Sequence, residues 1–394
     1  MSGFFRRTAL AACAALLVGA IAPAAQAAPA APPPARLQAL LDELVANGAS
    51  GAYALVNDGS GTTRLASGAA TLAPRRALEP DARVRAGSIT KTFTATVALQ
   101  LVGERRLALE DTVERWLPGL VPNGDRITVR QLLNHTSGLY NYTDEDFATQ
   151  LFTQPKVYRA PRELVALSTA QPPLFPPGKG WSYSNTNFIL VGLIAQAVTG
   201  RRVGELIHDR IIAPLNLTST SFPTFTWKID GPHAHGYYPP SLTGAGYVDV
   251  TAISASWAGA AGALVSNGPD LQRFYRALLS GELLAPAQLR EMQTTVDVDP
   301  TFGYGLGLYA QRSVCGTAWG HDGSVPGYAT FAFNDRAGRR SVVLAVPTQL
   351  DARLGPLTQL TLDTAICQMF GRSTPAPGAR TPGHPLPDNS RLTS

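Results

Sequence analysis

Hydrophobic positions near the start of the chain recur at helical spacing. Leucine and valine side chains occupy positions 37, 40, 41, 44 and 45, and Asn47-Gly48 follows them. A 3.6-residue period places these side chains on one face, so we expect an amphipathic helix over residues 36–47 that ends at the glycine. Two β-prone runs, 51–57 and 62–68, then flank Asp58-Gly59-Ser60-Gly61. That arrangement predicts a β-hairpin.

The other end of the chain repeats this arrangement in reverse order. Runs 328–334 and 340–347 flank Asp335-Arg336-Ala337-Gly338, and a helical pattern follows over 357–369. One antiparallel sheet built from both chain ends and flanked by the N- and C-terminal helices accounts for both patterns. The predicted fold class is therefore α/β, with the middle of the chain as an inserted, mostly helical region.

The predicted organisation divides the chain into four parts. Residues 28–104 and 266–371 form the α/β region, and residues 105–265 form the mostly helical region, with helices expected at 128–134, 162–169, 187–199 and 203–212. Residues 1–27 are expected to be a signal peptide. The Pro- and Gly-rich stretch 372–394 is expected to be a disordered tail.

Composition limits the range of possible functions. The chain has 394 residues, of which 45% are hydrophobic and 15% charged, so it can bury a large core. The formal net charge is +5, but the sequence contains no dense run of Lys or Arg. Without such a run, the charge indicates no nucleic-acid partner.

The N-terminal residues indicate export. Arg6 and Arg7 precede an apolar stretch over 8–21, and Pro23 and small residues up to Ala27 follow. This order is typical of a cleaved signal peptide. A membrane anchor is the alternative, but the apolar stretch is too short for a bilayer. We expect a secreted protein without a stable membrane anchor.

Two cysteines remain after removal of the leader, Cys315 and Cys367. An even number of cysteines in an exported protein favours a disulfide between them, and two buried free thiols are the alternative.

Ser88-Ile89-Thr90-Lys91 opens a run with helix-compatible spacing. Residues three apart share a helix face, so the Lys91 amine can reach the Ser88 hydroxyl. Burial and the positive helix end both disfavour a charged lysine there, which would leave Lys91 free to act as a base. A helix-capping serine and a solvated lysine are the alternative.

Tyr183-Ser184-Asn185 lies on a predicted loop before the helix at 187–199. Tyr183 could relay the Ser88 proton to a leaving amine. The Asn185 amide could hold Lys91 and bind a substrate carbonyl. A turn whose Asn caps the next helix would need no such chemistry.

Gly320-His321-Asp322-Gly323-Ser324 precedes the terminal hairpin, which suggests a strand edge beside the site. Here His321 would supply a hydrogen-bond donor, Gly323 would let the backbone approach a ligand, and the Ser324 N–H could form an oxyanion hole with that of Ser88. A surface histidine in a Gly-rich turn is the alternative.

The three segments occur in the order Ser, Tyr, His. With this combination, the chain resembles serine D-alanyl-D-alanine carboxypeptidases and related class C β-lactamases and esterases. The resemblance runs from about residue 39 to residue 371 and includes segment 127–139 and Tyr304-Gly305-Leu306-Gly307-Leu308. It implies a β-lactamase/transpeptidase-like fold. It further implies substrate-pocket walls at Phe147 and Trp257 and a bridge between Cys315 and Cys367.

The same resemblance implies a set of roles. The nucleophile is Ser88, its base partner Lys91, the proton relay Tyr183, the amide ligand Asn185 and the electrophilic histidine His321. Asp322, Gly323 and Ser324 belong to the expected substrate-binding strand. His135 is interpreted as structural, capping or bridging loops.

Two residues depart from the family pattern. Asp322 stands where relatives carry a hydroxyl residue, and Tyr309 lies near a position where relatives carry an Arg that binds a substrate carboxylate. A carboxylate beside a free peptide C-terminus would repel it.

The leading functional hypothesis is a secreted D-Ala-D-Ala carboxypeptidase that acts on peptidoglycan stem peptides and is acylated by β-lactams. Alternatives are a β-lactamase, esterase or D-amino-amidase of the same fold, or a non-catalytic module that binds penicillin or the cell wall. His233 and His235 lack a third ligand, so no metal site is expected. Neither a cofactor nor an oligomer is expected.

Overall fold

The computed structural model describes residues 33–143 and 145–373. The predicted signal peptide, the residues from 28 to 32 and the tail beyond 373 lie outside this range. Nine strands form one antiparallel sheet in the order β3-β2-β1-β13-β12-β11-β10-β9-β8. Their bounds are β1 Gly51–Asn57, β2 Thr62–Leu72, β3 Arg75–Ala77, β8 Val296–Asp299, β9 Phe302–Tyr304, β10 Tyr309–Ser313, β11 Gly316–Val325, β12 Tyr328–Asn334 and β13 Ser341–Val346.

The sheet joins both chain ends, as the sequence predicts. Strand β1 pairs with β13 over five residue pairs, from Tyr53–Ala345 to Asn57–Ser341. Alternate side chains along these strands face opposite sides of the sheet, so each strand contributes to two separate hydrophobic cores. Leu55 and Val343 belong to one core, and Ala54 and Leu344 belong to the other.

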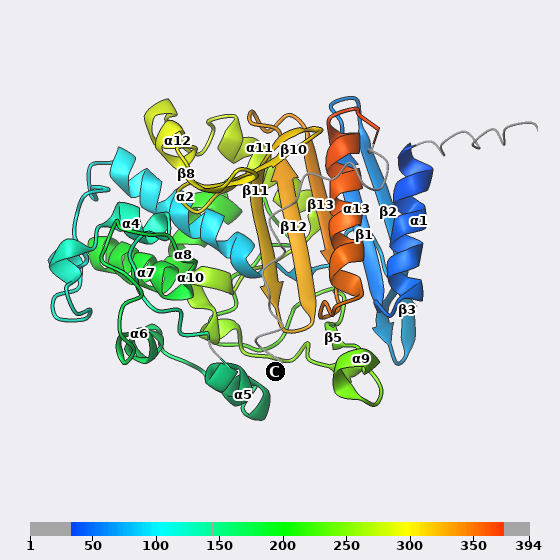
Figure 1. The fold of residues 1–394 in the computed structure, drawn as a ribbon, viewed down its shortest axis with the longest axis horizontal. Helices are drawn as coiled ribbons and strands as arrows, with labels where there is room; N and C mark the ends of the chain where they lie inside the picture. The colour runs from blue at the N-terminus through cyan, green and yellow to red at the C-terminus, as the bar shows by residue number, and fades with distance from the viewer. Residues whose placement is uncertain (1–32, 144, 374–394) are drawn as a thin grey trace, which may run out of the picture. The chain divides into compact units, whose positions relative to one another are not determined.

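Helices cover both faces of this sheet. Helices α1 (Pro33–Ala46) and α13 (Leu354–Met369) lie side by side on one face (Figure 1). Helix α11 (Gly268–Leu279) packs on the opposite face against β1, β12 and β13. Helix α2 (Thr90–Gly103) packs on that side against β11.

Most of the remaining helices and short strands lie in the inserted region. Helix α7 is surrounded by α2, α4, α6, α8 and α10, so it lies at the centre of this region. The helices are α3 Val113–Trp116, α4 Val129–Leu133, α5 Glu145–Thr153, α6 Pro161–Thr169, α7 Asn185–Thr199, α8 Val203–Ile207, α9 Pro240–Thr243, α10 Gly259–Gly262 and, after the insertion, α12 Pro286–Met292. Short strands β4 (Val84–Arg85) and β7 (Val265–Ser266) pair, as do β5 (Tyr237–Tyr238) and β6 (Val248–Asp249).

Several predicted boundaries differ from the structure. Helix α7 begins at Asn185, so the last residue of the Tyr-Ser-Asn segment is helical and not in the loop. Ser88 lies in a short 3-10 turn, η1 (Gly87–Ile89), and α2 begins after it at Thr90. The predicted helix over 203–212 is α8 followed by a π-helical turn at His208–Ile212.

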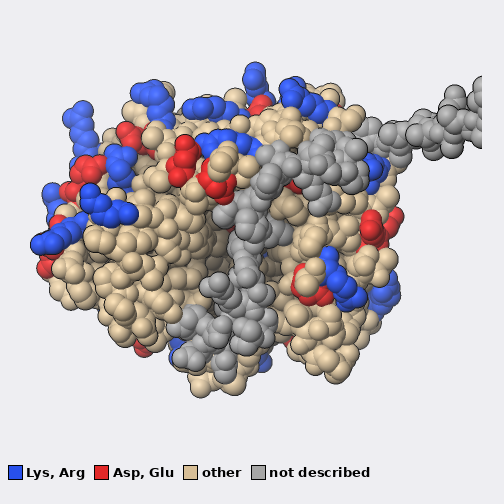
Figure 2. All heavy atoms as spheres, in the orientation of Figure 1, with Lys and Arg blue, Asp and Glu red and all other residues tan. Residues whose placement is uncertain are grey.

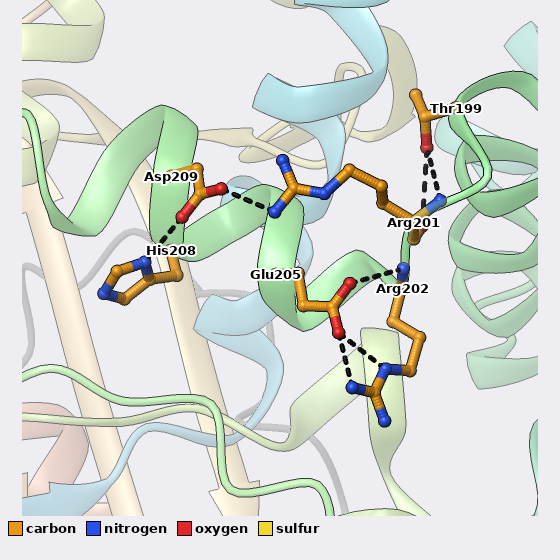
Figure 3. Close-up of polar contacts among 6 residues, drawn as sticks. All are labelled: Thr199, Arg201, Arg202, Glu205, His208 and Asp209. Carbon is orange, nitrogen blue, oxygen red and sulfur yellow. Dashed lines mark hydrogen bonds and ion pairs between the residues drawn. The ribbon is translucent and has the colours of Figure 1, made fainter.

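The corner between α7 and α8 is organised by surface ion pairs (Figure 3). Gly200 ends α7 with a φ of 75°, a conformation that glycine adopts without strain. Arg201 then reaches Asp209 at 2.5 Å, and Arg202 pairs with Glu205 one helical turn away. All four side chains are at least 39% exposed, so these pairs contribute little to stability.

The structure contains the predicted disulfide. Cys315 and Cys367 are bonded, with Cα atoms 5.1 Å apart and a sequence separation of 52. The bond ties the turn between β10 and β11 to the last helix, α13.

Charges on the face shown in Figure 2 are of mixed sign and leave broad neutral areas between them. Within residues 33–143 and 145–373, no helix has both the length and the apolar character needed to cross a bilayer.

Candidate active site

Ser88 and Lys91 meet at the start of α2. The Lys91 side chain is fully buried and its Nζ lies 2.9 Å from the Ser88 Oγ. Two further oxygens surround the amine: Asn185 Oδ1 at 2.7 Å and the Ala261 carbonyl at 2.8 Å. Ser88 itself stays partly exposed, so a substrate can reach its hydroxyl.

The environment of Lys91 favours the neutral amine. Burial holds the pKa of Lys91 well below its ordinary value, and the Asp322 carboxylate opposes this effect in part. A neutral amine has two N–H groups and one lone pair. The oxygens of Asn185 and Ala261 can accept one hydrogen bond each from these two N–H groups. The lone pair is then left to accept the Ser88 hydroxyl proton. The geometry therefore fits a general base acting on Ser88.

Asn141 and Thr143 set the orientation of the Asn185 amide. The Asn185 backbone N–H donates to Asn141 Oδ1 at 3.0 Å, and its side-chain Nδ2 donates to Thr143 Oγ1 at 3.1 Å. The opposite atom of the amide, Oδ1, is thereby turned toward Lys91. Asn141 and Thr143 lie in a loop and belong to none of the three sequence motifs, so no sequence pattern identified them.

Tyr183 lies on the other side of the nucleophile. Lys91 Nζ lies 4.8 Å from the centre of the Tyr183 ring, and the phenol is hydrogen-bonded to Ser88. Burial raises the pKa of Tyr183 well above its ordinary value, and the bond to Ser88 reduces that rise. The phenol therefore holds its proton at neutral pH and can donate it.

Strand β11 brings its backbone next to Ser88. A Cβ on Gly323 would lie 1.9 Å from the Ala86 carbonyl oxygen and 2.9 Å from the Ser88 nitrogen, so only glycine fits there. A Cβ on Gly87, whose φ is 53°, would similarly lie 2.8 Å from the Ser324 nitrogen. The backbone of residues 86–88 thus packs directly against that of Gly323 and Ser324, so the Ser88 and Ser324 nitrogens belong to segments in close contact, as the expected oxyanion hole requires.

Strand β10 pairs with only the first half of β11. Strand β10 pairs with residues 316–320, and that register ends at the Tyr309–Gly320 pair. The five residues from His321 to Val325 extend beyond β10 and retain pairing with β12 on the other side. An extended peptide can therefore lie along this part of β11.

His321 joins the cluster, but both of its ring nitrogens have protein partners. Nδ1 lies 2.5 Å from the Asp322 carbonyl oxygen and Nε2 lies 2.9 Å from the Tyr304 hydroxyl. Burial, with a contribution from Lys91, lowers the pKa of His321 to about 3, so the ring is neutral. Its Nδ1–H donates to the carbonyl and its Nε2 accepts from Tyr304. A hydrogen bond from His321 to a substrate would require one of these contacts to break.

Asp322 and Tyr309 form a buried, hydrogen-bonded pair. The Tyr309 hydroxyl donates to Asp322 Oδ1 at 2.8 Å, and the same carboxylate oxygen lies 3.6 Å from His321 Nδ1. The carboxylate acts electrostatically on both Lys91 and Tyr183. The two residues that depart from the family pattern are therefore in contact with each other.

Phe147 and Trp257 also lie together, with ring centres 6.1 Å apart and both side chains buried. Tyr142 links them to the site, because its hydroxyl donates to the Trp257 carbonyl at 2.6 Å and its ring lies 5.4 Å from Phe147. Tyr142 is next to Asn141 and Thr143, which hold Asn185.

His135 connects the loops around Tyr183. Its Nδ1 accepts from the Ser184 backbone N–H at 3.2 Å and faces Asn187 Nδ2 at 3.0 Å. Its ring lies 4.3 Å from that of Tyr183. Burial lowers the pKa of His135 well below its ordinary value, so the ring is neutral and Nδ1 is the acceptor. The structure thus supports the loop-bridging interpretation and places His135 in contact with the Tyr183 ring.

Within the described part of the chain, no three His, Cys, Asp or Glu side chains are grouped so that they could hold a metal ion. His233 and His235 stack on each other, and His235 Nδ1 pairs with Asp249 at 2.6 Å.

Comparison with known proteins identifies similar chains. The family model described as "Beta-lactamase" matches residues 37–361. A solved structure of a D-stereospecific amidohydrolase from Streptomyces sp. is 40% identical, with a TM-score of 0.78, and the match covers 85% of this chain and 98% of that one.

Two curated relatives are more distant. Penicillin-binding protein 4* of Bacillus subtilis (strain 168) is 28% identical over 70% of this chain and 63% of its own length. A D-aminopeptidase of Brucella anthropi is 29% identical over 71% of this chain and 52% of its own length. The chain thus spans between about half and two thirds of the length of these relatives.

Proposed function

Because this chain belongs to the beta-lactamase family, and is a serine hydrolase with that fold, we propose that it hydrolyses D-amino-acid amides and D-peptides through an acyl-enzyme on Ser88. The observation that carries the proposal is the contact of Ser88 with a buried Lys91, whose pKa burial holds well below its ordinary value. The amidohydrolase and the D-aminopeptidase among the similar proteins support the choice of substrate class.

Acylation uses groups already in contact. The Ser88 hydroxyl gives its proton to Lys91 Nζ as its oxygen attacks the substrate carbonyl carbon. The backbone N–H groups of Ser88 and Ser324 stabilise the resulting oxyanion. When the C–N bond breaks, the Tyr183 phenol protonates the leaving nitrogen and recovers a proton from Lys91. Lys91 is then neutral again.

Deacylation reverses the proton transfers. Water loses a proton to the neutral Lys91 and adds to the ester carbon of the acylated Ser88. The bond between that carbon and the serine oxygen then breaks, and the oxygen takes the proton back. The products are a free acid and the original enzyme.

Asp322 determines which leaving groups fit. Asp322 belongs to the part of β11 that extends beyond β10, and its carboxylate acts electrostatically on Lys91 and Tyr183, so we expect it to act on the leaving group of a bound peptide as well. A free C-terminal carboxylate there would face like charge, whereas an amide N–H or an ammonium group would find an acceptor. Amides and amidated peptides are therefore the substrates that this site favours.

A matched pair of peptides tests this specificity. We expect faster hydrolysis of an acetylated D-Ala-D-Ala amide than of the same peptide with a free carboxylate, and of D-phenylalanine amide than of its L form. Ser88→Ala should abolish all turnover. Full turnover in that variant, or a preference for the L amide, would contradict the proposal.

A D-Ala-D-Ala carboxypeptidase is the second candidate, favoured by the similarity to penicillin-binding protein 4*. Such an enzyme would release D-alanine from a peptide with a free carboxylate and would form a long-lived adduct with penicillin on Ser88. Preference for the free carboxylate in the peptide pair above selects this candidate.

We also propose that the protein acts outside the cytoplasm. The order of charged, apolar and small residues up to Ala27 is typical of a signal peptide, and disulfides such as Cys315–Cys367 persist in oxidising compartments. N-terminal sequencing of the protein recovered from the culture medium should begin just after Ala27. Recovery only from the cytoplasm with an intact leader would contradict this.

A further inference from the structure

A second cavity lies behind the catalytic lysine. It has a volume of about 330 Å³ and lies among α6, α7, α8 and α10. Its floor is apolar, formed in part by Ile189, Leu193, Val203, Phe222 and Ala260. Cavities of this size and lining are typical of small-molecule sites.

Helix α10 forms part of the wall between this cavity and the catalytic groups. Ala260 lines the cavity, whereas the carbonyl of the next residue, Ala261, accepts from Lys91. None of the lining residues belongs to the cluster around Ser88. The cavity is therefore a separate site.

The rim of the cavity is cationic. Arg159, Arg162 and Arg202 line it, and no Asp or Glu does. Arg202 is paired with Glu205 (Figure 3), but among the described residues no carboxylate pairs with Arg159 or Arg162. The Arg159 guanidinium donates to the neutral Gln154 side chain at 3.2 Å, and its backbone N–H donates to Ser256 Oγ at 2.9 Å.

Exposed aromatic rings stand beside the opening. Tyr158 lines the cavity and is 45% exposed, and its ring lies 5.4 Å from that of Phe225, which is 68% exposed. Large apolar side chains left in contact with water beside a cavity are typical of a binding surface. Their flat faces suit a flat apolar group.

We propose that this cavity binds a small organic anion with a flat apolar body, of the aromatic monocarboxylate class. The ring enters the apolar floor between α7 and α10, and the carboxylate remains at the rim, where the guanidinium groups of Arg159 and Arg162 donate to it. This proposal is independent of the reaction at Ser88.

Calorimetric titration of the full chain with 2-naphthoate tests the charge requirement, with the neutral analogue 2-acetylnaphthalene as the comparison. We expect saturable binding of the carboxylate that is about tenfold tighter than binding of the ketone. The double variant Arg159→Gln/Arg162→Gln should lose that advantage and leave the ketone unaffected. Arg64→Gln removes an exposed arginine on β2 and should change neither affinity.

The location is tested separately. Leu193→Trp fills the cavity from α7 without altering α10 and should abolish binding of both ligands, while unchanged reactivity of Ser88 reports an intact fold. Protein blocked covalently at Ser88 should bind 2-naphthoate as the free protein does.

Loss of binding on blocking Ser88 would place the ligand in the catalytic site and overturn the proposal. Equal affinities for the carboxylate and the ketone, or the absence of saturable binding, would overturn it as well. If Leu193→Trp does not fold, the arginine variant and the Ser88-blocked protein still decide the question.

Discussion

Lys91 must be neutral to accept the Ser88 proton, and its burial supplies the reason. We expect Lys91→Met to lower kcat/KM for an amide substrate roughly 10²- to 10⁴-fold, the range for loss of a general base. Lys228→Met, which removes an exposed lysine, is the matched control and should leave kcat/KM unchanged. Similar losses in both variants would refute the assigned role.

Asp322 connects substrate choice to the pH dependence of the reaction. Its negative charge raises the pKa of Lys91 and that of Tyr183. Removing the charge in Asp322→Asn should lower both values, so both limbs of the kcat/KM profile should move to lower pH. The amide oxygen of the variant can still accept from Tyr309. A profile displaced toward higher pH would contradict this electrostatic account.

His135 is a positioning residue, because it touches the Tyr183 ring and the loop backbone but not the nucleophile. We expect His135→Ala to lower kcat more than it raises KM and to cost about 2–4 kcal/mol of stability through a buried cavity and unpaired N–H groups. His135→Asn should recover much of both losses, because its oxygen can replace Nδ1 and asparagine tolerates the φ of 63°. Identical behaviour of the two variants would exclude the hydrogen-bonding role.

Only some residues of the candidate site could be predicted from the sequence. Ser88 and Lys91 could be predicted because one helical turn fixes their spacing. Asn141 and Thr143 could not, because only tertiary packing brings this loop to Asn185. The engagement of both His321 nitrogens was equally hidden, since Tyr304 precedes His321 by 17 residues and reaches it only through the pairing of β9, β10 and β11.

Among the elements, those with clear periodicity were predicted and the irregular ones were not. Strands β1, β12 and β13 are mostly apolar and almost fully buried runs. Strand β8 is short and only partly buried, so its sequence carries little pattern. Helix α11 did offer a signal, because Asn267 caps it and Pro269 lies in its first turn.

The disulfide stabilises the connection between β11 and α13. A closed loop of 52 residues corresponds to about 4 kcal/mol of unfolding free energy in the chain-entropy account. Denaturant unfolding of Cys315→Ala/Cys367→Ala should show a loss near this size. Arg202→Ala, which removes one exposed ion pair at the α7–α8 corner (Figure 3), is the contrasting variant and should cost less than about 1 kcal/mol.

For the molecule as a whole, the sheet separates two hydrophobic cores, and β11, which carries His321 and Ser324, extends beyond its pairing with β10. The pattern at the two chain ends predicted this sheet, because hairpins and flanking helices are local features. How the inserted region meets it was not predictable in detail, since α7 and α10 reach Lys91 through contacts between residues 94 and 170 positions apart.

The most direct test of the account asks whether Ser88 is the activated serine and whether Lys91 activates it. Wild-type protein is treated with a nitrophenyl phosphonate ester and examined by peptide mass spectrometry, with release of nitrophenol followed over time. The account predicts one phosphonyl group per chain on the Ser88 peptide, with labelling at least about 100-fold slower in Lys91→Met. Labelling at another residue, or equal rates in the two proteins, would contradict it.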